Sequence, residues 1–124
     1  MKRILIVDDA AMIRMYHRQL LESAGYQVDE AINGIEALEK ALMRQYDLFV
    51  VDINMPKMDG CTFLRELRAR PEIEQSPAIM VSTESKQKDQ IAAFEAGANY
   101  YVIKPADPLS FVRVVALMLG RAHT

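Results

Sequence analysis

Five side chains that could form a cation and phosphate site stand at the ends of short apolar runs. They are Asp8, Asp9, Asp52, Ser82 and Lys104. Two carboxylates about 4 Å apart repel by roughly 4 kcal/mol at an effective dielectric constant of 20, so three together need compensating cations. Mg²⁺ binds carboxylates together with water and phosphate, and an aspartate can form an aspartyl phosphate. The set predicts Mg²⁺-dependent phosphoryl transfer, with Asp52 as nucleophile and Lys104 as a second source of positive charge.

The apolar runs before these residues have the length and the isoleucine and valine content of buried strands. The predicted strands are Arg3–Val7, Gln27–Ala31, Leu48–Val51, Ala78–Val81 and Tyr100–Ile103. The segments between them place apolar residues at helical spacing, and Asn33, Asp59 and Asp107 stand where helix caps are expected. The predicted helices run from about Ile13 to Ala24, from Asn33 to Leu42, from Asp59 past Leu67, from Lys86 to Ala96 and from Pro108 to about Gly120.

This alternation of strands and helices predicts the architecture. We expect an α/β fold with a doubly wound, five-stranded parallel sheet and five helices, in one domain over residues 1–124. Right-handed crossovers bring the carboxyl ends of all the strands to one edge of the sheet. Ligands of such folds bind at that edge, which is where the five polar residues stand.

Composition argues against several kinds of partner. A net charge of −2 does not favour binding to nucleic acid, and no run approaches the roughly 20 apolar residues of a membrane span. The single cysteine, Cys61, cannot form an internal disulfide, which is typical of a reducing compartment. We therefore expect a cytoplasmic protein without nucleic-acid or membrane partners. His17 and His123 are expected at the surface, and the eight methionines are expected to fill the core.

Other interpretations of the polar residues are open at this stage. Taken singly, Asp8 and Asp9 could cap a helix, and the other three could be ordinary turn or loop residues. A flavin-binding protein of the same fold would need a Ser-, Thr- or Gly-rich phosphate loop after the first strand, where this chain has Asp8-Asp9-Ala10-Ala11. A hydrolase that uses an aspartyl phosphate would carry an Asp-x-Asp pair, where this chain has Asp52-Ile53-Asn54.

Three stretches of the chain resemble those of a known family. They are Ile4-Leu5-Ile6-Val7-Asp8-Asp9, Val51-Asp52-Ile53-Asn54-Met55-Pro56-Lys57-Met58-Asp59-Gly60 and Tyr101-Val102-Ile103-Lys104-Pro105. They are similar to the signature stretches of response-regulator receiver domains, and the resemblance covers essentially the whole chain. It implies a flavodoxin-like sheet with strand order 2-1-3-4-5. It also implies a two-component switch that accepts a phosphoryl group from a histidine kinase or phosphotransfer protein.

The resemblance implies roles for the matching positions. Asp52 would be the phosphoacceptor and Lys104 would pair with the phosphoryl group, before a cis bond to Pro105. Asp9, Asp52 and the backbone carbonyl of Asn54 would bind Mg²⁺, with Mn²⁺ as a substitute, and Asp8 would orient a metal-bound water. The chain would catalyse only its own phosphorylation and slow autodephosphorylation, so it would be a switch and not an enzyme.

Further positions would control the state of the switch. Ser82 would hydrogen-bond the phosphoryl group, and Tyr101 would turn inward as Ser82 moves. Asn54 and Glu84 occupy positions that adjust how fast water removes the phosphate in the family. Phosphorylation would then shift the balance between two pre-existing conformations.

The last helix is apolar on nearly every side. The residues expected to face the sheet are Val112, Val115, Ala116 and Leu119, and those expected on the outer face are Val114, Leu117 and Met118. An apolar outer face usually marks an interaction site. We expect this face and Tyr101 to bind a target protein or a second copy of the chain after phosphorylation.

The ends of the chain and a few departures from the family bear on its context. Met1 stands directly before the first strand and the chain ends soon after the last helix. We therefore expect a stand-alone receiver, the alternative being a receiver excised from a longer regulator with an effector domain. Chemotaxis is one pathway such a protein could serve. Ala10 stands where chemotaxis relatives often have an aromatic residue, and Ser82 and Ala106 differ from residues common in the family, which weakens the expectation of a flagellar-motor partner.

Overall fold

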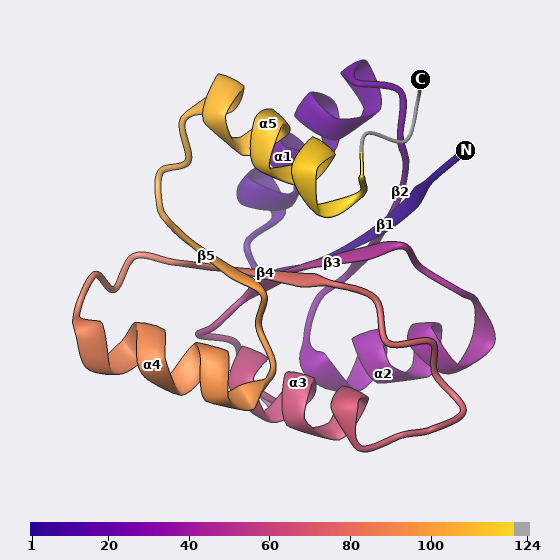
Figure 1. Ribbon diagram of the computed structural model, residues 1–124, viewed down its shortest axis with the longest axis vertical. Coiled ribbons are helices and arrows are strands. Elements are labelled where there is room, and N and C mark those ends of the chain that lie inside the picture. The colour runs from indigo at the N-terminus through magenta and orange to yellow at the C-terminus, as the bar shows by residue number, and fades with distance from the viewer. Residues whose placement is uncertain (121–124) are drawn as a thin grey trace.

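The computed structural model describes residues 1–120, and these form ten elements in strict alternation (Figure 1). The strands are β1 (Arg3–Val7), β2 (Gln27–Ala31), β3 (Leu48–Asp52), β4 (Ala78–Ser82) and β5 (Tyr100–Ile103). The helices are α1 (Ala11–Ser23), α2 (Gly34–Met43), α3 (Gly60–Arg68), α4 (Gln87–Ala96) and α5 (Pro108–Met118). All the predicted strands and helices are confirmed, and their boundaries differ from the prediction by only a few residues.

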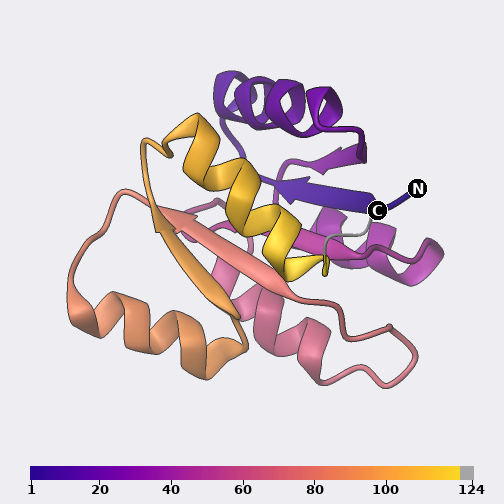
Figure 2. The same ribbon diagram turned by 45° about the horizontal axis from the view of Figure 1, so that its top comes forward.

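The five strands form one parallel sheet in the order β2-β1-β3-β4-β5. Helices α1 and α5 cover one face, and α2, α3 and α4 cover the other (Figures 1 and 2). The predicted doubly wound fold and its strand order are therefore confirmed. None of the helices in residues 1–120 is long and apolar enough to cross a membrane.

The central strands are buried on both faces because a helical layer covers each. Successive side chains of a strand point to opposite faces, so Leu5 and Val7 pack under α2, α3 and α4. Their neighbours Ile4 and Ile6 pack under α1 and α5. This explains the nearly continuous apolar runs of β1, β3 and β4, which are typical of parallel sheets covered on both sides.

Three helices begin at side-chain caps in the positions expected from sequence. Asn33 accepts a hydrogen bond from the Glu36 amide at 2.9 Å, and the Glu36 carboxylate accepts one from the Ile32 amide at 2.7 Å. Asp59 caps α3 through the amide of Thr62. Asp107 caps α5 in the same way, ahead of Pro108 in the first turn. These caps fix where each helix starts, and so fix the lengths of the loops at the carboxyl edge.

The apolar stripe of α5 differs from the prediction. Its buried residues are Phe111 and Val115, followed by Leu119 just after the helix. Val114 and Met118 were expected on the outer face, but both pack partly against the same core. The large Phe111 ring decides the orientation, because it turns its own side of the helix toward the sheet. Only Leu117 of the predicted outer residues is well exposed, at 69%.

Two expectations about single residue types also need correction. His17 was expected at the surface but is buried, with its ring centroid 4.8 Å from that of Phe111. Met80 is a core residue, whereas Met12, Met15 and Met43 are exposed, so the methionines are not uniformly core filler. His123 lies outside the described residues.

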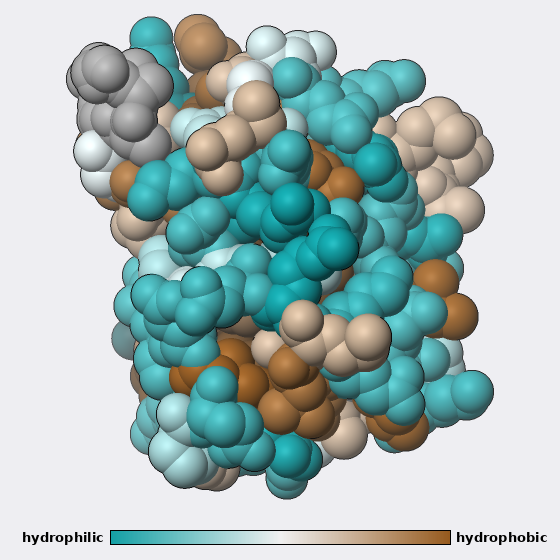
Figure 3. Space-filling model, turned by 90° about the vertical axis from the view of Figure 1, so that its right-hand side faces the viewer, coloured by the Kyte–Doolittle hydropathy of each residue, from teal (hydrophilic) through white to brown (hydrophobic). Residues whose placement is uncertain are grey.

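The edge where the strands begin is mostly hydrophilic, with a hydrophobic area on the side covered by α2 and α3 (Figure 3).

Candidate metal and phosphoryl-transfer site

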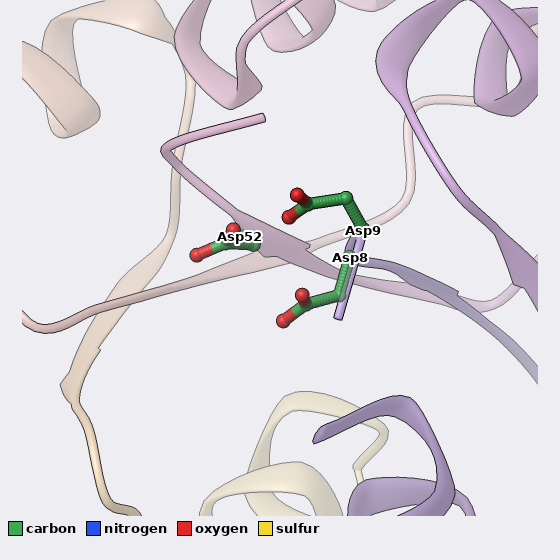
Figure 4. A group of neighbouring side chains, drawn as sticks. All are labelled: Asp8, Asp9 and Asp52. Carbon is green, nitrogen blue, oxygen red and sulfur yellow. The ribbon is translucent and has the colours of Figure 1, made fainter. Parts of the chain in front are cut away.

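Three carboxylates converge at the carboxyl edge of the sheet (Figure 4). Asp8 and Asp9 follow β1, and Asp52 is the last residue of the neighbouring strand β3. One carboxylate oxygen from each lies within 4.8 Å of the other two. Asp8 and Asp52 are buried and Asp9 is exposed, so the group opens to solvent on the side of Asp9.

Lys104 reaches two of these carboxylates from the far side of β4. Its ammonium donates hydrogen bonds to Asp52 Oδ1 at 2.9 Å and to Asp8 Oδ2 at 3.1 Å. The Lys104 backbone is itself fixed, because its amide donates to the Ser82 carbonyl at 2.8 Å. The bond to Pro105 is cis, as the family resemblance implied. One cation against three carboxylates leaves the site with two uncompensated negative charges.

Burial and the charges of the site shift the pKa values of Asp52 and Lys104. Burial raises the pKa of Asp52, and the charge of Asp8 adds to this, while the hydrogen bond from Lys104 acts in the opposite direction. Burial alone would lower the pKa of Lys104, but its hydrogen bond to Asp52 and the negative charges around it raise that pKa. The surroundings therefore favour the charged form of Lys104 and disfavour the ionised form of Asp52.

The residues present fit a hard divalent cation. Mg²⁺ takes oxygen ligands and usually binds one or two carboxylates while keeping several waters. Three carboxylates converge here, which is more than Mg²⁺ usually binds. The exposed side at Asp9 leaves room for water and for a phosphoryl group. A charge of +2 would balance the charge that Lys104 leaves uncompensated.

The loop after β3 passes close to the backbone of Asp52. Lys57 has a positive φ of 68°, which lets the chain turn back. The Gly60 amide donates to the Ile53 carbonyl at 2.8 Å. A Cβ on Gly60 would lie 2.4 Å from the Asp52 backbone carbonyl, so only glycine allows this approach. No role was predicted for Gly60 from sequence, although the Asp59-Gly60 pair was a signal for such a turn.

Ser82 and Tyr101 meet at the loop between β4 and α4. Ser82 is fully buried, and its hydroxyl oxygen accepts a hydrogen bond from the Glu84 amide at 3.0 Å. The Tyr101 hydroxyl donates to the Glu84 carbonyl at 2.8 Å. The Tyr101 ring packs partly against the core, and its turn inward as Ser82 moves stays a prediction. Both residues therefore hold the same residue, Glu84, through its backbone.

The side chains of the remaining predicted residues lie around the site without joining its hydrogen bonds. Asn54 and Glu84 are exposed, each two residues past a strand end. No side-chain hydrogen bond of either is present in the part of the chain that the structure describes. Their effect on dephosphorylation stays a prediction. Cys61 is half-buried, and burial raises the pKa of its thiol, which agrees with an unreactive role.

The sequence matches the family described as response regulator receiver domain over residues 4–116. Among curated proteins, it is 40% identical over 120 residues to the transcriptional regulatory protein ResD of Bacillus subtilis, covering 97% of this chain and 49% of ResD. It is 36% identical over 121 residues to the transcriptional regulatory protein SrrA of Staphylococcus aureus, covering 98% of this chain and 49% of SrrA. The chain thus spans about half the length of these relatives.

Solved structures with the same fold include two that bear on the site. The chemotaxis protein CheY4 of Vibrio cholerae superposes with a TM-score of 0.90 at 32% identity, covering 96% of this chain and 99% of that one. The receiver domain of the sensor histidine kinase PA1611 from Pseudomonas aeruginosa gives a TM-score of 0.88 at 29% identity, with coverage of 96% and 98%. That structure has a magnesium ion coordinated in its active site cleft.

Proposed function

Because the chain belongs to the response regulator receiver domains, we propose that it accepts a phosphoryl group on Asp52 from a histidine kinase or phosphotransfer protein. The observation that carries this proposal is the position of Asp52. It is buried at a strand end, within 4.8 Å of two further carboxylates, and bonded to Lys104 at 2.9 Å. A structural role alone would not favour so many like charges in one place.

The transfer follows from the groups present. An Asp52 oxygen attacks phosphorus, the bond from phosphorus to the donor nitrogen breaks, and the electron pair leaves with the donor imidazole. Lys104 then pairs with an oxygen of the transferred phosphoryl group. Mg²⁺ would offset the negative charge of the acidic cluster, so that an anionic donor can approach it. Asp9, Asp52 and the Asn54 carbonyl would hold the ion, with Asp8 orienting a bound water. Mn²⁺, which takes similar ligands, should substitute.

The test is uptake of labelled phosphoryl groups from acetyl phosphate, with and without EDTA. Asp47→Asn is the matched control, because Asp47 precedes the strand that Asp52 ends. Wild type and Asp47→Asn should be labelled only when divalent metal is present. Asp52→Asn should stay unlabelled, and labelling of this variant at the wild-type level would exclude Asp52 as the acceptor.

The switch would act through Glu84. Phosphorylation adds about −1.5 to −2 charges beside Lys104, and the Ser82 hydroxyl, which accepts a hydrogen bond from the Glu84 amide, would move toward the new oxygens to donate to one of them. The Glu84 amide then loses its acceptor, and the loop that Tyr101 holds at the Glu84 carbonyl can move. A differential interaction of about 1–3 kcal/mol would give a useful shift in population.

NMR with and without beryllofluoride tests this connection. Amides of residues 83–90 should shift in wild type, together with the ring signals of Tyr101. Tyr101→Phe removes only the hydroxyl that reaches Glu84, so it should change the response of this loop and leave the response of the Asp52 backbone intact. Unchanged signals at Tyr101 and at residues 83–90 in wild type would exclude this route.

The output surface would lie on α4, β5 and α5. The exposed apolar residues there include Ile91 and Phe94 on α4, Tyr100 on β5 and Leu117 on α5. Tyr101 and Val114 line a hollow of about 160 Å³ between β5 and α5. Because Tyr101 also holds the switching loop, its movement would alter this surface. We propose that phosphorylation promotes docking of a target protein or a second copy of the chain here.

Sedimentation with beryllofluoride compares Leu117→Glu with Leu42→Glu, which places the same charge on an exposed leucine of α2. Pull-down of candidate partners uses the same pair. Leu117→Glu should lose the activated association, and Leu42→Glu should keep it. If both variants are activated normally and associate like wild type, α5 is not the output surface.

Two kinds of similar protein suggest two different pathways. The curated relatives are named transcriptional regulators, and this chain spans about half their length. Chemotaxis is supported only by structural likeness to proteins such as CheY4. Profiling of phosphotransfer from candidate histidine kinases would distinguish a transcriptional pathway from chemotaxis. Rapid transfer should come from the cognate kinase alone.

A further inference from the structure

Arg14 ties the acidic cluster to the rest of the fold through the backbone of Asp8. It lies in the first turns of α1, and its side chain is only 15% exposed. One guanidinium nitrogen, Nη1, donates to the Asp8 backbone carbonyl at 2.8 Å. Another, Nε, donates to the Glu30 carboxylate of β2 at 2.8 Å. The rigid guanidinium therefore bridges the ends of two neighbouring strands.

Asp8 has a partner for each of its polar groups. Its amide donates to the Ala31 carbonyl at 3.0 Å, and its carbonyl accepts from Arg14. Of its carboxylate oxygens, one accepts from the Ala10 amide at 2.9 Å and the other from Lys104 at 3.1 Å. A residue held in this way has little freedom to adjust its backbone when one neighbour changes.

Asp9 stands in contrast. Its carboxylate is exposed and has no hydrogen-bond partner among residues 1–120. Its position relative to Asp52 therefore depends on the backbone that carries it and on its own rotamer. The peptide group that joins Asp8 to Asp9 is planar, so the hydrogen bond from Arg14 to the Asp8 carbonyl also orients the bond that leads into Asp9.

We propose that Arg14 is a positioning residue for the divalent cation, acting through the Asp8–Asp9 peptide to hold the Asp9 carboxylate beside that of Asp52. The proposal rests on the proposed function, since it concerns the same site. Groups that orient metal ligands from outside the coordination shell commonly change metal affinity by about 10- to 100-fold when they are removed.

A plain electrostatic effect predicts the opposite sign, which makes the proposal testable. Arg14 carries a positive charge close to a cation site, so its removal should strengthen cation binding if charge alone matters. Arg18 provides the matched control. It lies one turn further along α1 and donates to the same Glu30 carboxylate at 2.6 Å, but none of its hydrogen bonds reaches Asp8.

The experiment measures Mg²⁺ affinity of the metal-free protein by calorimetry and by NMR titration, for wild type, Arg14→Met, Arg18→Met and Arg14→Lys. Arg14→Met should bind Mg²⁺ about ten-fold more weakly than wild type. Arg18→Met should match wild type or bind slightly more tightly. Arg14→Lys keeps the charge but cannot bridge Asp8 and Glu30 as a planar fork does, so its affinity should also fall.

Two further measurements keep the outcomes distinct. Amide shifts of Asp9 and Ala10 in metal-free protein should change in Arg14→Met and not in Arg18→Met, and urea unfolding checks that the variants are folded. Wild-type affinity in Arg14→Met or in Arg14→Lys would overturn the positioning role while leaving the proposed function intact. Failure of the wild type to bind Mg²⁺ would overturn both. If Arg14→Met does not fold, the comparison of Arg14→Lys with Arg18→Met decides.

Discussion

Two charge clusters meet at Asp8, and they are balanced in opposite ways. Around Glu30, one carboxylate accepts hydrogen bonds from two guanidinium groups, those of Arg14 and Arg18. Burial would raise the pKa of Glu30, but these bonds outweigh it and lower that pKa. Around Asp52, three carboxylates share one ammonium, and the pKa of Asp52 is raised.

The difference separates a stabilising cluster from a reactive one. Excess cation around Glu30 stabilises its ionised form and holds α1 against β2. Burial, together with the neighbouring carboxylates, destabilises the ionised form of Asp52, and this energy becomes available when a cation or a phosphoryl group arrives. Groups whose charges are left unbalanced at a cleft are typical of functional sites.

The largest effect is expected for Lys104→Met in metal-free protein at neutral pH. It removes the one charged nitrogen group among residues 1–120 that is bonded to the carboxylates of Asp8 and Asp52, so the free energy of unfolding should fall by about 3 kcal/mol. Added Mg²⁺ should recover part of the loss. Urea unfolding measures both, with exposed Lys88→Met as control. Equal stability of the two variants without metal would show that the acidic cluster is not strained.

Asp52→Asn should change stability in the opposite direction, with a gain of about 1 kcal/mol at neutral pH, a common size for relief of strain at a functional site. The folded-state pKa of Asp52 lies above its ordinary value of 3.8. The ionised group therefore lowers the free energy of unfolding above its folded-state pKa, and this cost disappears as pH falls below 3.8. Denaturation as a function of pH should show the gain only on the neutral side. A loss of stability at neutral pH would contradict the comparison.

Glu30→Gln should cost under about 1 kcal/mol, because its pairs with Arg14 and Arg18 are partly exposed. The pKa of Glu30 is lowered from 4.5, so its stabilising effect is fully present above that pH. The effect is lost as pH falls through the folded-state value. The deficit of Glu30→Gln should therefore vanish in acid, as followed by thermal unfolding. A deficit that persists in acid would point to packing and not to charge.

The smallest effect is expected at His17, which reports how far the charge of Asp8 extends. Burial lowers the pKa of His17 below 6.5, while the charge of Asp8 opposes this. Below that pH the unfolded chain takes up a proton that the folded chain does not, so stability falls with falling pH. His17→Leu should be less sensitive to pH than wild type between pH 7 and 5. An identical slope in both chains would show that Asp8 offsets the burial.

Much of the fold and of the site could be predicted from the sequence because both depend on local patterns. Apolar runs define the strands, and parallel connections place Asp8, Asp9, Asp52 and Lys104 at one edge. The caps at Asn33, Asp59 and Asp107 are local in the same sense. Each of these inferences needs only a residue and its near neighbours.

The parts that sequence could not supply depend on contacts between distant elements. His17 is buried because Phe111 of α5 packs on it, and helical spacing cannot say which neighbour a face will meet. The same ring turned α5 so that Val114 and Met118 pack against the core. The hydrogen bond from Arg14 to the Asp8 backbone carbonyl could not be predicted for a different reason. Every residue has a backbone carbonyl, so the sequence does not mark which one accepts.

The most direct test of the central claim is peptide mapping by mass spectrometry after incubation with acetyl phosphate and Mg²⁺. The account predicts a mass increase of one phosphoryl group per chain, confined to the peptide that contains Asp52 and absent when EDTA is added. A phosphoryl group on any other residue, or its full retention in EDTA, would contradict it.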